Sequence, residues 1–246
     1  MFLNSRLLIF FSSLLFFCPK AMAQQQDWAS IYSKVLQRSI DISIYDSNPS
    51  KKEKPIVYLT DGRKLLENGV MDSIKRLTLF GQIPFATYVF VSTVDRVSGQ
   101  DYRNENFFCN PSYIRFFESE LVPFVEKGHE KGKSSFERSL VGISFGGLNA
   151  AYFSARTDLF GNYALLSPVI YPCKKVISDI SFSQNKSLRI ILTTGKNDAE
   201  NYVDELERIY GSKGYELSTI ETNGQHDFNN WNAQWRYVLN FLISFD

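Results

Sequence analysis

One serine in the chain has neighbours that could make it a nucleophile. Ser144 is the centre of the sequence Gly-Ile-Ser-Phe-Gly at positions 142–146. An apolar stretch precedes it and helix-favouring residues follow from Leu148, so the pattern predicts a strand, a sharp turn and a helix, with the serine at the apex. The flanking glycines allow strand and helix to pass close to the turn. The start of the helix would offer N–H groups to an oxyanion. The alternative is a structural glycine-rich turn.

A serine hydroxyl is a weak nucleophile unless a base accepts its proton. The chain has two histidines, His129 and His226. His129 lies in a charged stretch that is typical of an exposed surface. His226 follows the last predicted strand, and in a parallel sheet this places it at the carboxyl edge, as for Ser144. We therefore expect His226 to be the base. The alternative is a structural, hydrogen-bonded histidine.

A carboxylate would orient the histidine, and Asp198 is the predicted residue. It directly follows a predicted strand, and the chain order Ser144, Asp198, His226 is that of α/β-hydrolases. An aspartate in this position is also a common turn former. Glu200, Asp204 or the absence of any acid therefore stay open from the sequence alone.

An oxyanion at the reacting ester would need two backbone N–H donors. The residue after the nucleophile, Phe145, is expected to supply one. The second is expected from the turn after an earlier strand, which contains Gly62 and Arg63. That turn could equally be an ordinary Asp-Gly turn. With these donors the sequence predicts acyl transfer to Ser144 and then to water, with His226 acting first as base and then as acid.

These residues must be held at one edge of a sheet. Strand-type segments alternate with helix-type segments along the chain, which predicts an α/β fold with a mostly parallel central sheet and helices on both faces. The segment 31–45 predicts one or two further strands, which could be antiparallel, with Ile40, Ile42 and Ile44 on the buried face. Pro123 is expected to kink the helix that begins after Asn110. The other predicted strands are 56–60, 86–92, the stretch before Ser144, 163–168, 188–193 and 217–221.

Candidate substrate-binding residues come from two loops. Residues 93–109 form a long polar and aromatic segment, and a loop of this length is either disordered or functional. Tyr102, Phe107 and Phe108 from this loop and Tyr171 from the segment after strand 163–168 could line a pocket for an aromatic acyl or catecholate group. Arg96 and Arg103 could hold an anionic group. The alternatives are rings that pack the loop and a solvated arginine.

The N-terminus has the pattern of a secretory signal peptide. Arg6 precedes a nearly uninterrupted apolar run at 7–17, and Ala-Met-Ala at 21–23 suits a cleavage site. The run is too short for a membrane span, and bulky residues before Cys18 disfavour lipidation. We expect residues 1–23 to be removed and residues 24–246 to form a single α/β-hydrolase domain. The mature protein is expected to be periplasmic or secreted, with no stable membrane anchor.

Charge and cysteine content exclude several classes of partner. Removing Arg6 and Lys20 from the 27 basic residues leaves 25 against 26 acidic residues, which gives no electrostatic footprint for nucleic acid. Two remaining cysteines and two histidines do not form a zinc motif, so the sequence predicts no metal and no cofactor. Cys109 and Cys173 could form a disulfide or stay as two buried thiols.

Five motifs occur in order along the chain. They are Tyr-Leu-Thr-Asp-Gly at 58–62, Glu-Leu-Val-Pro at 120–123, Gly-Ile-Ser-Phe-Gly-Gly at 142–147, Leu-Ser-Pro at 166–168, and Gln-His-Asp-Phe at 225–228 followed by Trp231. From about Ser33 to the end, this set resembles the enterochelin esterase-like putative esterases of the α/β-hydrolase superfamily. Gln225 departs from that family's glycine at this position.

The resemblance implies a periplasmic or secreted hydrolase for siderophore lactones, acyl groups on sugars or similar esters. Some members of the family use a serine–histidine dyad, which keeps the role of Asp198 open. The substrate is therefore expected to be a small-molecule or glycan ester. Two alternatives remain: an acyltransferase that uses the same acyl-enzyme, and a catalytically silent protein that binds a siderophore or glycan.

Overall fold

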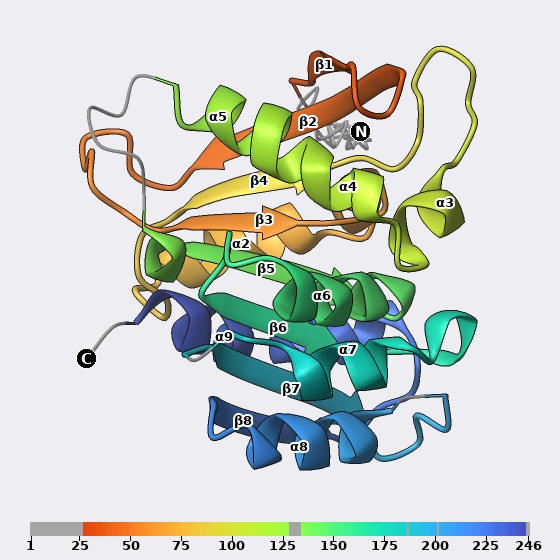
Figure 1. Cartoon of the computed structure of the whole chain (residues 1–246). Coiled ribbons are helices and arrows are strands. Elements are labelled where there is room, and N and C mark those ends of the chain that lie inside the picture. The colour runs from red at the N-terminus through yellow and green to blue at the C-terminus, as the bar shows by residue number, and fades with distance from the viewer. Residues whose placement is uncertain (1–26, 128–133, 186, 201, 245–246) are drawn as a thin grey trace, which may run out of the picture.

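Eight strands form one sheet in the computed structural model of the protein, which describes residues 27–127, 134–185, 187–200 and 202–244 (Figure 1). The strand order is β1-β2-β4-β3-β5-β6-β7-β8. The predicted signal peptide at 1–23 and His129 lie outside the described residues. No helix in the described ranges is both long and apolar enough to cross a membrane.

Six strands of the sheet are parallel, as predicted, and β1 and β2 form the antiparallel edge. The parallel strands β3 to β7 are short and rich in Val, Ile and Leu, and nearly all of their residues are buried, as expected for strands covered on both faces. The strands are β1 (Ala29–Ser33), β2 (Arg38–Asp46), β3 (Ile56–Leu59), β4 (Thr87–Val91), β5 (Arg138–Ile143), β6 (Asn162–Leu166), β7 (Arg189–Gly195) and β8 (Glu216–Thr222).

Helices cover both faces of the sheet and bury two separate apolar clusters (Figure 1). One face carries α3 (Arg103–Phe107), α4 (Pro111–Phe116), α5 (Val122–Val125), α6 (Phe145–Arg156), α7 (Val176–Phe182) and α8 (Val203–Ser212). The other face carries α1 (Gly62–Glu67), α2 (Val70–Leu79) and α9 (Phe228–Ile243). The predicted fold class is therefore confirmed.

The predicted kink at Pro123 takes the form of a π-helical turn. Helix α4 begins after Asn110, whose side chain accepts a hydrogen bond from the N–H of Ser112, and it continues into the π turn η1 (Phe117–Leu121) and then α5. Proline has no N–H to donate to the preceding turn and its ring crowds that turn, so the helix widens just before it.

The predicted alternation in β2 is only partly correct. Ile40 and Ile42 are buried as expected, but Ile44 is exposed, and Asp41 and Ser43 are buried. Strand β2 lies between β1 and β4, and Asp41 lines a hollow beneath α1 and α2 instead of facing open solvent. A two-residue period in the sequence indicates that one face of the strand is apolar. It does not show how much of the other face is covered by neighbouring helices.

The fold shows how the long predicted loop and the two cysteines are arranged. The long segment 93–109 contains α3 and is therefore not entirely loop. A short 3-10 turn, η3 (Tyr171–Cys173), and α7 follow β6 where no helix was predicted. Cys109 and Cys173 form a disulfide with a Cα–Cα distance of 6.3 Å, which links the end of α3 to η3.

Candidate active site

The turn between β5 and α6 holds Ser144 in an unusual backbone conformation. Its φ of 58° and ψ of −117° lie outside the regions that non-glycine residues normally occupy, which costs about 1–3 kcal/mol. The Ser144 N–H donates to the carbonyl of Leu166, and the Ser144 carbonyl accepts from the N–H groups of Leu148 and Val169. These bonds to β6 and α6 hold the serine at the carboxyl edge of the sheet.

The close approach predicted from the flanking glycines is present at Gly142, whereas a Cβ added to Gly146 would lie 3.1 Å from Oγ1 of Thr60, a tight but milder contact. A Cβ added to Gly142 would lie 1.9 Å from the carbonyl oxygen of Gly146, and one added to Gly147 would lie 2.8 Å from Cα of Pro168. Neither contact is sterically possible. Side chains at Gly142 and Gly147 would therefore force the strand, the helix and the β6 loop apart.

Three side chains predicted from distant parts of the chain meet at this edge. Nε2 of His226 lies 2.9 Å from Oγ of Ser144, and Nδ1 of His226 lies 3.0 Å from Oδ1 of Asp198. The Asp198 side chain is fully buried, while 19% of the His226 side chain is exposed. Oδ1 of Asp198 also accepts from the N–H of Glu200. Of the three acids considered from the sequence, Asp198 is the one whose carboxylate meets the histidine.

The loop that carries His226 is fixed by contacts that sequence reasoning did not assign. The Trp231 ring packs edge-on against the imidazole, with centroids 5.1 Å apart, and its Nε1–H donates to Oγ of Ser167. Asp227 caps α9 by accepting from the N–H of Asn230. Trp231 had one sequence signal, its place after the Gln-His-Asp-Phe motif. Ser167 had only its place in the Leu-Ser-Pro motif.

Ser144 and His226 open into a cavity of about 340 Å³. Its wall combines apolar rings from the start of α9 with charged groups from α1 and α3. The lining residues are Asp61, Lys64, Leu65, Arg103, Ile143, Ser144, His226, Asp227, Phe228 and Trp231. A neighbouring cavity of about 400 Å³ is lined by Tyr171, Ala199, Glu200 and Tyr202.

Comparison with models of protein families assigns the chain to a family. The family model for putative esterases matches residues 33–240, which is most of the sequence. The chain belongs to the putative esterase family. None of the curated proteins is significantly similar to it.

Solved structures of similar fold include three hydrolases. The enterobactin esterase from Shigella flexneri, solved in the presence of enterobactin, has a TM-score of 0.77 at 22% identity and covers 92% of this chain and 60% of that chain. A ferulic acid esterase has a TM-score of 0.71 at 18% identity, and the match covers 88% of this chain and 96% of that chain. The enterobactin and salmochelin hydrolase IroE has a TM-score of 0.65 at 17% identity, and the match covers 88% of this chain and 93% of that chain.

These similarities show the fold of this putative esterase. At identities of 22% or less, they do not extend to its substrate. The chain also spans only about three fifths of the length of the Shigella enterobactin esterase. The shared fold is the α/β-hydrolase fold that the chain order of Ser144, Asp198 and His226 predicted.

Arg103, which was predicted to hold an anionic group, lines the cavity of the putative esterase and is also part of a buried ion pair. Its Nε–H donates to both carboxylate oxygens of Asp61, at 2.7 and 2.9 Å, and its Nη2 donates to the carbonyl of Ile143. Burial raises the pKa of Asp61, and the adjacent Arg103 guanidinium offsets part of that rise. The charge of Arg103 is therefore balanced within the protein, and its role toward a substrate stays a prediction.

Phe108 and Tyr171 pack on either side of Phe145, the residue that follows Ser144. The Phe145 ring meets Phe108 edge-on at 5.1 Å and Tyr171 edge-on at 5.7 Å between centroids. Neither outer ring lines the cavity of Ser144 itself, and Tyr171 lines the neighbouring one. Phe108 and Tyr171 therefore lie beside Phe145 and not directly over Ser144. Of the other two predicted rings, Phe107 is fully buried and Tyr102 lies under the Arg38 guanidinium at 4.0 Å, and neither lines the cavity of Ser144.

The predicted oxyanion donors lie at two helix starts. Phe145 is the first residue of α6, where N–H groups have no partner within the helix. Gly62 begins α1 and packs so closely on β4 that an added Cβ would lie 2.5 Å from the Phe90 carbonyl carbon. The Arg63 side chain pairs with Glu67 and lines a different hollow. The second N–H donor, from Gly62 or Arg63, stays a prediction.

Proposed function

We propose that the protein is a serine carboxylic-ester hydrolase that works through an acyl-enzyme on Ser144. The observation that carries this proposal is the 2.9 Å separation of Nε2 of His226 from Oγ of Ser144, with Asp198 behind the imidazole. Membership of the putative esterase family supports ester bonds as the target.

The geometry supports a specific proton path. The Asp198 carboxylate can only accept a hydrogen bond, so Nδ1 of His226 carries the proton and Nε2 is free to accept one. As Oγ of Ser144 attacks the ester carbonyl carbon, its proton moves to Nε2, and the carbonyl electrons move to the oxygen. The N–H of Phe145 and that of Gly62 or Arg63 would stabilise this oxyanion.

The second half of the reaction reverses these roles. When the tetrahedral intermediate collapses, the bond to the alcohol breaks and His226 protonates the leaving oxygen. Water then attacks the acyl group on Ser144, and His226 takes the proton from that water. The free acid leaves and Oγ regains its proton.

We further propose that the substrate is a siderophore lactone, an acyl group on a sugar or a similar ester. The rings of Phe108, Phe145 and Tyr171 beside the nucleophile support an aromatic group on that ester. Two proteins of similar fold, an enterobactin esterase and a ferulic acid esterase, support the same chemical class.

We propose that the protein works in the periplasm or outside the cell. The signal-peptide pattern at 1–23 supports this location. The Cys109–Cys173 disulfide supports it as well, because disulfides persist in oxidising compartments and are rare in the cytosol.

The proposed reaction is tested by incubating residues 24–246 with p-nitrophenyl butyrate and following release of p-nitrophenol. Turnover above the uncatalysed rate, with butyric acid as the product, is the expected result. Transfer of the butyryl group to an added sugar or alcohol in place of water would identify an acyltransferase. No turnover with any ester, together with no labelling by a fluorophosphonate, would identify a binding protein and contradict the proposal.

Asp198→Asn is expected to lower kcat for p-nitrophenyl butyrate by about 10⁴-fold, the loss seen when a triad acid is made neutral without a change of shape. An asparagine amide can donate to Nδ1, which would leave the proton on Nε2, where it cannot accept one from Ser144. The matched control is Asp204→Asn, an exposed residue of α8, which should stay within about twofold of the wild type. Wild-type turnover by Asp198→Asn would point to a serine–histidine dyad.

A further inference from the structure

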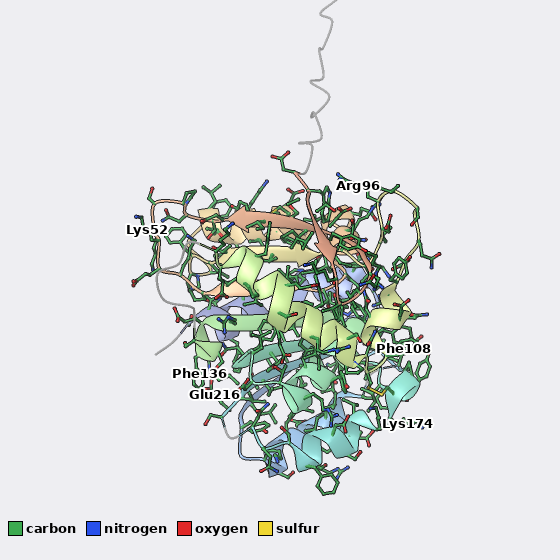
Figure 2. All side chains as sticks on the ribbon, turned by 45° about the horizontal axis from the view of Figure 1, so that its top comes forward. Lys52, Arg96, Phe108, Phe136, Lys174 and Glu216 are labelled. Carbon is green, nitrogen blue, oxygen red and sulfur yellow. A yellow bond between two sulfur atoms is a disulfide. The ribbon has the colours of Figure 1, made fainter. Side chains whose placement is uncertain are left out.

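A disulfide encloses the nucleophile turn in a covalent loop. It joins Cys109, just after α3, to Cys173 at the end of η3, across a sequence separation of 64 residues. The enclosed segment includes β5, Ser144, α6 and β6. Figure 2 labels Phe108 and Lys174, each adjacent to one of the two cysteines, on the same side of the molecule.

The two joined segments carry the outer rings of an aromatic ridge, which we define as Phe108, Phe145 and Tyr171. Phe145 is the middle ring, with Phe108 on one side and Tyr171 on the other. The Arg103 guanidinium lies 5.2 Å from the Phe145 ring centroid. Ser144, which directly precedes Phe145, lines the same cavity as Arg103, and Tyr171 lines the neighbouring cavity.

The three rings are anchored very differently. Phe145 begins the twelve-residue helix α6, which is largely buried. Phe108 follows α3, a helix of five residues, and helices this short are not stable without tertiary contacts. Tyr171 lies in the three-residue turn η3, and 57% of its surface is exposed. The outer rings thus depend on short segments whose ends the disulfide ties together.

We propose that the Cys109–Cys173 disulfide positions the aromatic ridge, and that the ridge binds an aromatic acyl group of the substrate. This inference rests on the proposed esterase function. Cys109 and Cys173 are positioning residues, because the chemistry at Ser144, His226 and Asp198 does not involve them. Opening the disulfide releases the outer rings from one another and weakens binding of aromatic esters more than binding of small aliphatic ones.

The test compares methyl cinnamate with methyl butyrate, two esters with the same leaving group, by proton release. Reduction of the wild type, verified by titration of two thiols, is expected to raise KM for methyl cinnamate. The ratio of kcat/KM for cinnamate to that for butyrate should fall about tenfold, the effect of losing one or two aromatic contacts. The variant Cys109→Ala/Cys173→Ala should show the same ratio without reductant and should not respond to it.

A matched pair of tyrosines separates the ridge from general surface effects. Tyr171→Ala should lower the cinnamate-to-butyrate ratio, whereas Tyr237→Ala on α9, which removes a ring of similar exposure (53% against 57%), should not. A ratio unchanged after verified reduction would overturn the proposal. An equal loss for both esters, with a lower melting temperature, would also overturn it, because the disulfide would then be purely structural. Failure of the oxidised protein to hydrolyse either ester or to be labelled at Ser144 would instead reject the proposed function itself.

Discussion

Replacing Ser144 with alanine is expected to lower kcat for p-nitrophenyl butyrate by about four to six orders of magnitude, as for other triad nucleophiles. The variant has no oxygen to form the acyl-enzyme, and only binding and oxyanion stabilisation would remain. Release of p-nitrophenol under saturating substrate measures the effect. Because alanine lacks only the hydroxyl, the β5–turn–α6 backbone should stay in place.

The control for this change is Ser178→Ala, an exposed serine on α7 whose hydroxyl donates to the carbonyl of Lys175. It should retain wild-type kcat within about twofold, since surface substitutions of this kind change little. Comparable turnover by Ser144→Ala and the wild type would contradict the assignment of Ser144 as nucleophile.

The second large effect is expected from His226→Ala, which should lower kcat by about four to six orders of magnitude as well. Without the imidazole at 2.9 Å, Ser144 would lose the base that we propose accepts its proton as its oxygen attacks. Added imidazole should restore part of the activity, because it can occupy the space that the side chain leaves and accept the proton.

Rescue by imidazole distinguishes a base from a structural residue. His226 also packs against Trp231, so its loss could simply loosen the start of α9. Full loss without any rescue, together with a much lower melting temperature, would favour the structural explanation. The chain's other histidine provides the control, and His129→Ala should keep wild-type activity and should not respond to imidazole.

The sequence predicted the sheet and the sharp turn that carries Ser144 well because their signals are local. The apolar runs of β3 to β7 are short and bounded by turn residues, and Gly142 and Gly147 are required because an added Cβ would make contacts of 1.9 and 2.8 Å. His226 followed from the topology, since one of the two histidines lies after the last strand. All of these features could be predicted from spacing and residue type.

The partners of these residues depend on tertiary structure and could not be predicted in this way. Asp198, Glu200 and Asp204 lie within seven positions of each other, and only the relative placement of the β7 and β8 loops shows which one faces the imidazole. Whether Cys109 and Cys173 meet depends on how α3 and η3 pack around Phe145, and no local pattern encodes that.

Short elements that are stabilised by side-chain contacts with distant residues were also not predicted from the sequence. Helix α3 lies in a segment without clear periodicity, and its first residue, Arg103, is fixed by the ion pair with Asp61, 42 positions away in sequence. Similarly, Asp41 is buried because α1 and α2 cover its side of β2. In both cases a distant contact decides the structure, and local propensity gives little information.

The acyl-enzyme site is tested most directly by reaction of the mature protein with a fluorophosphonate and mapping of the adduct by tandem mass spectrometry. We expect one adduct, on the peptide that contains Ser144, at a rate that falls by several orders of magnitude in His226→Ala. An adduct on a different serine, or active esterase that stays unlabelled, would contradict Ser144 as the nucleophile.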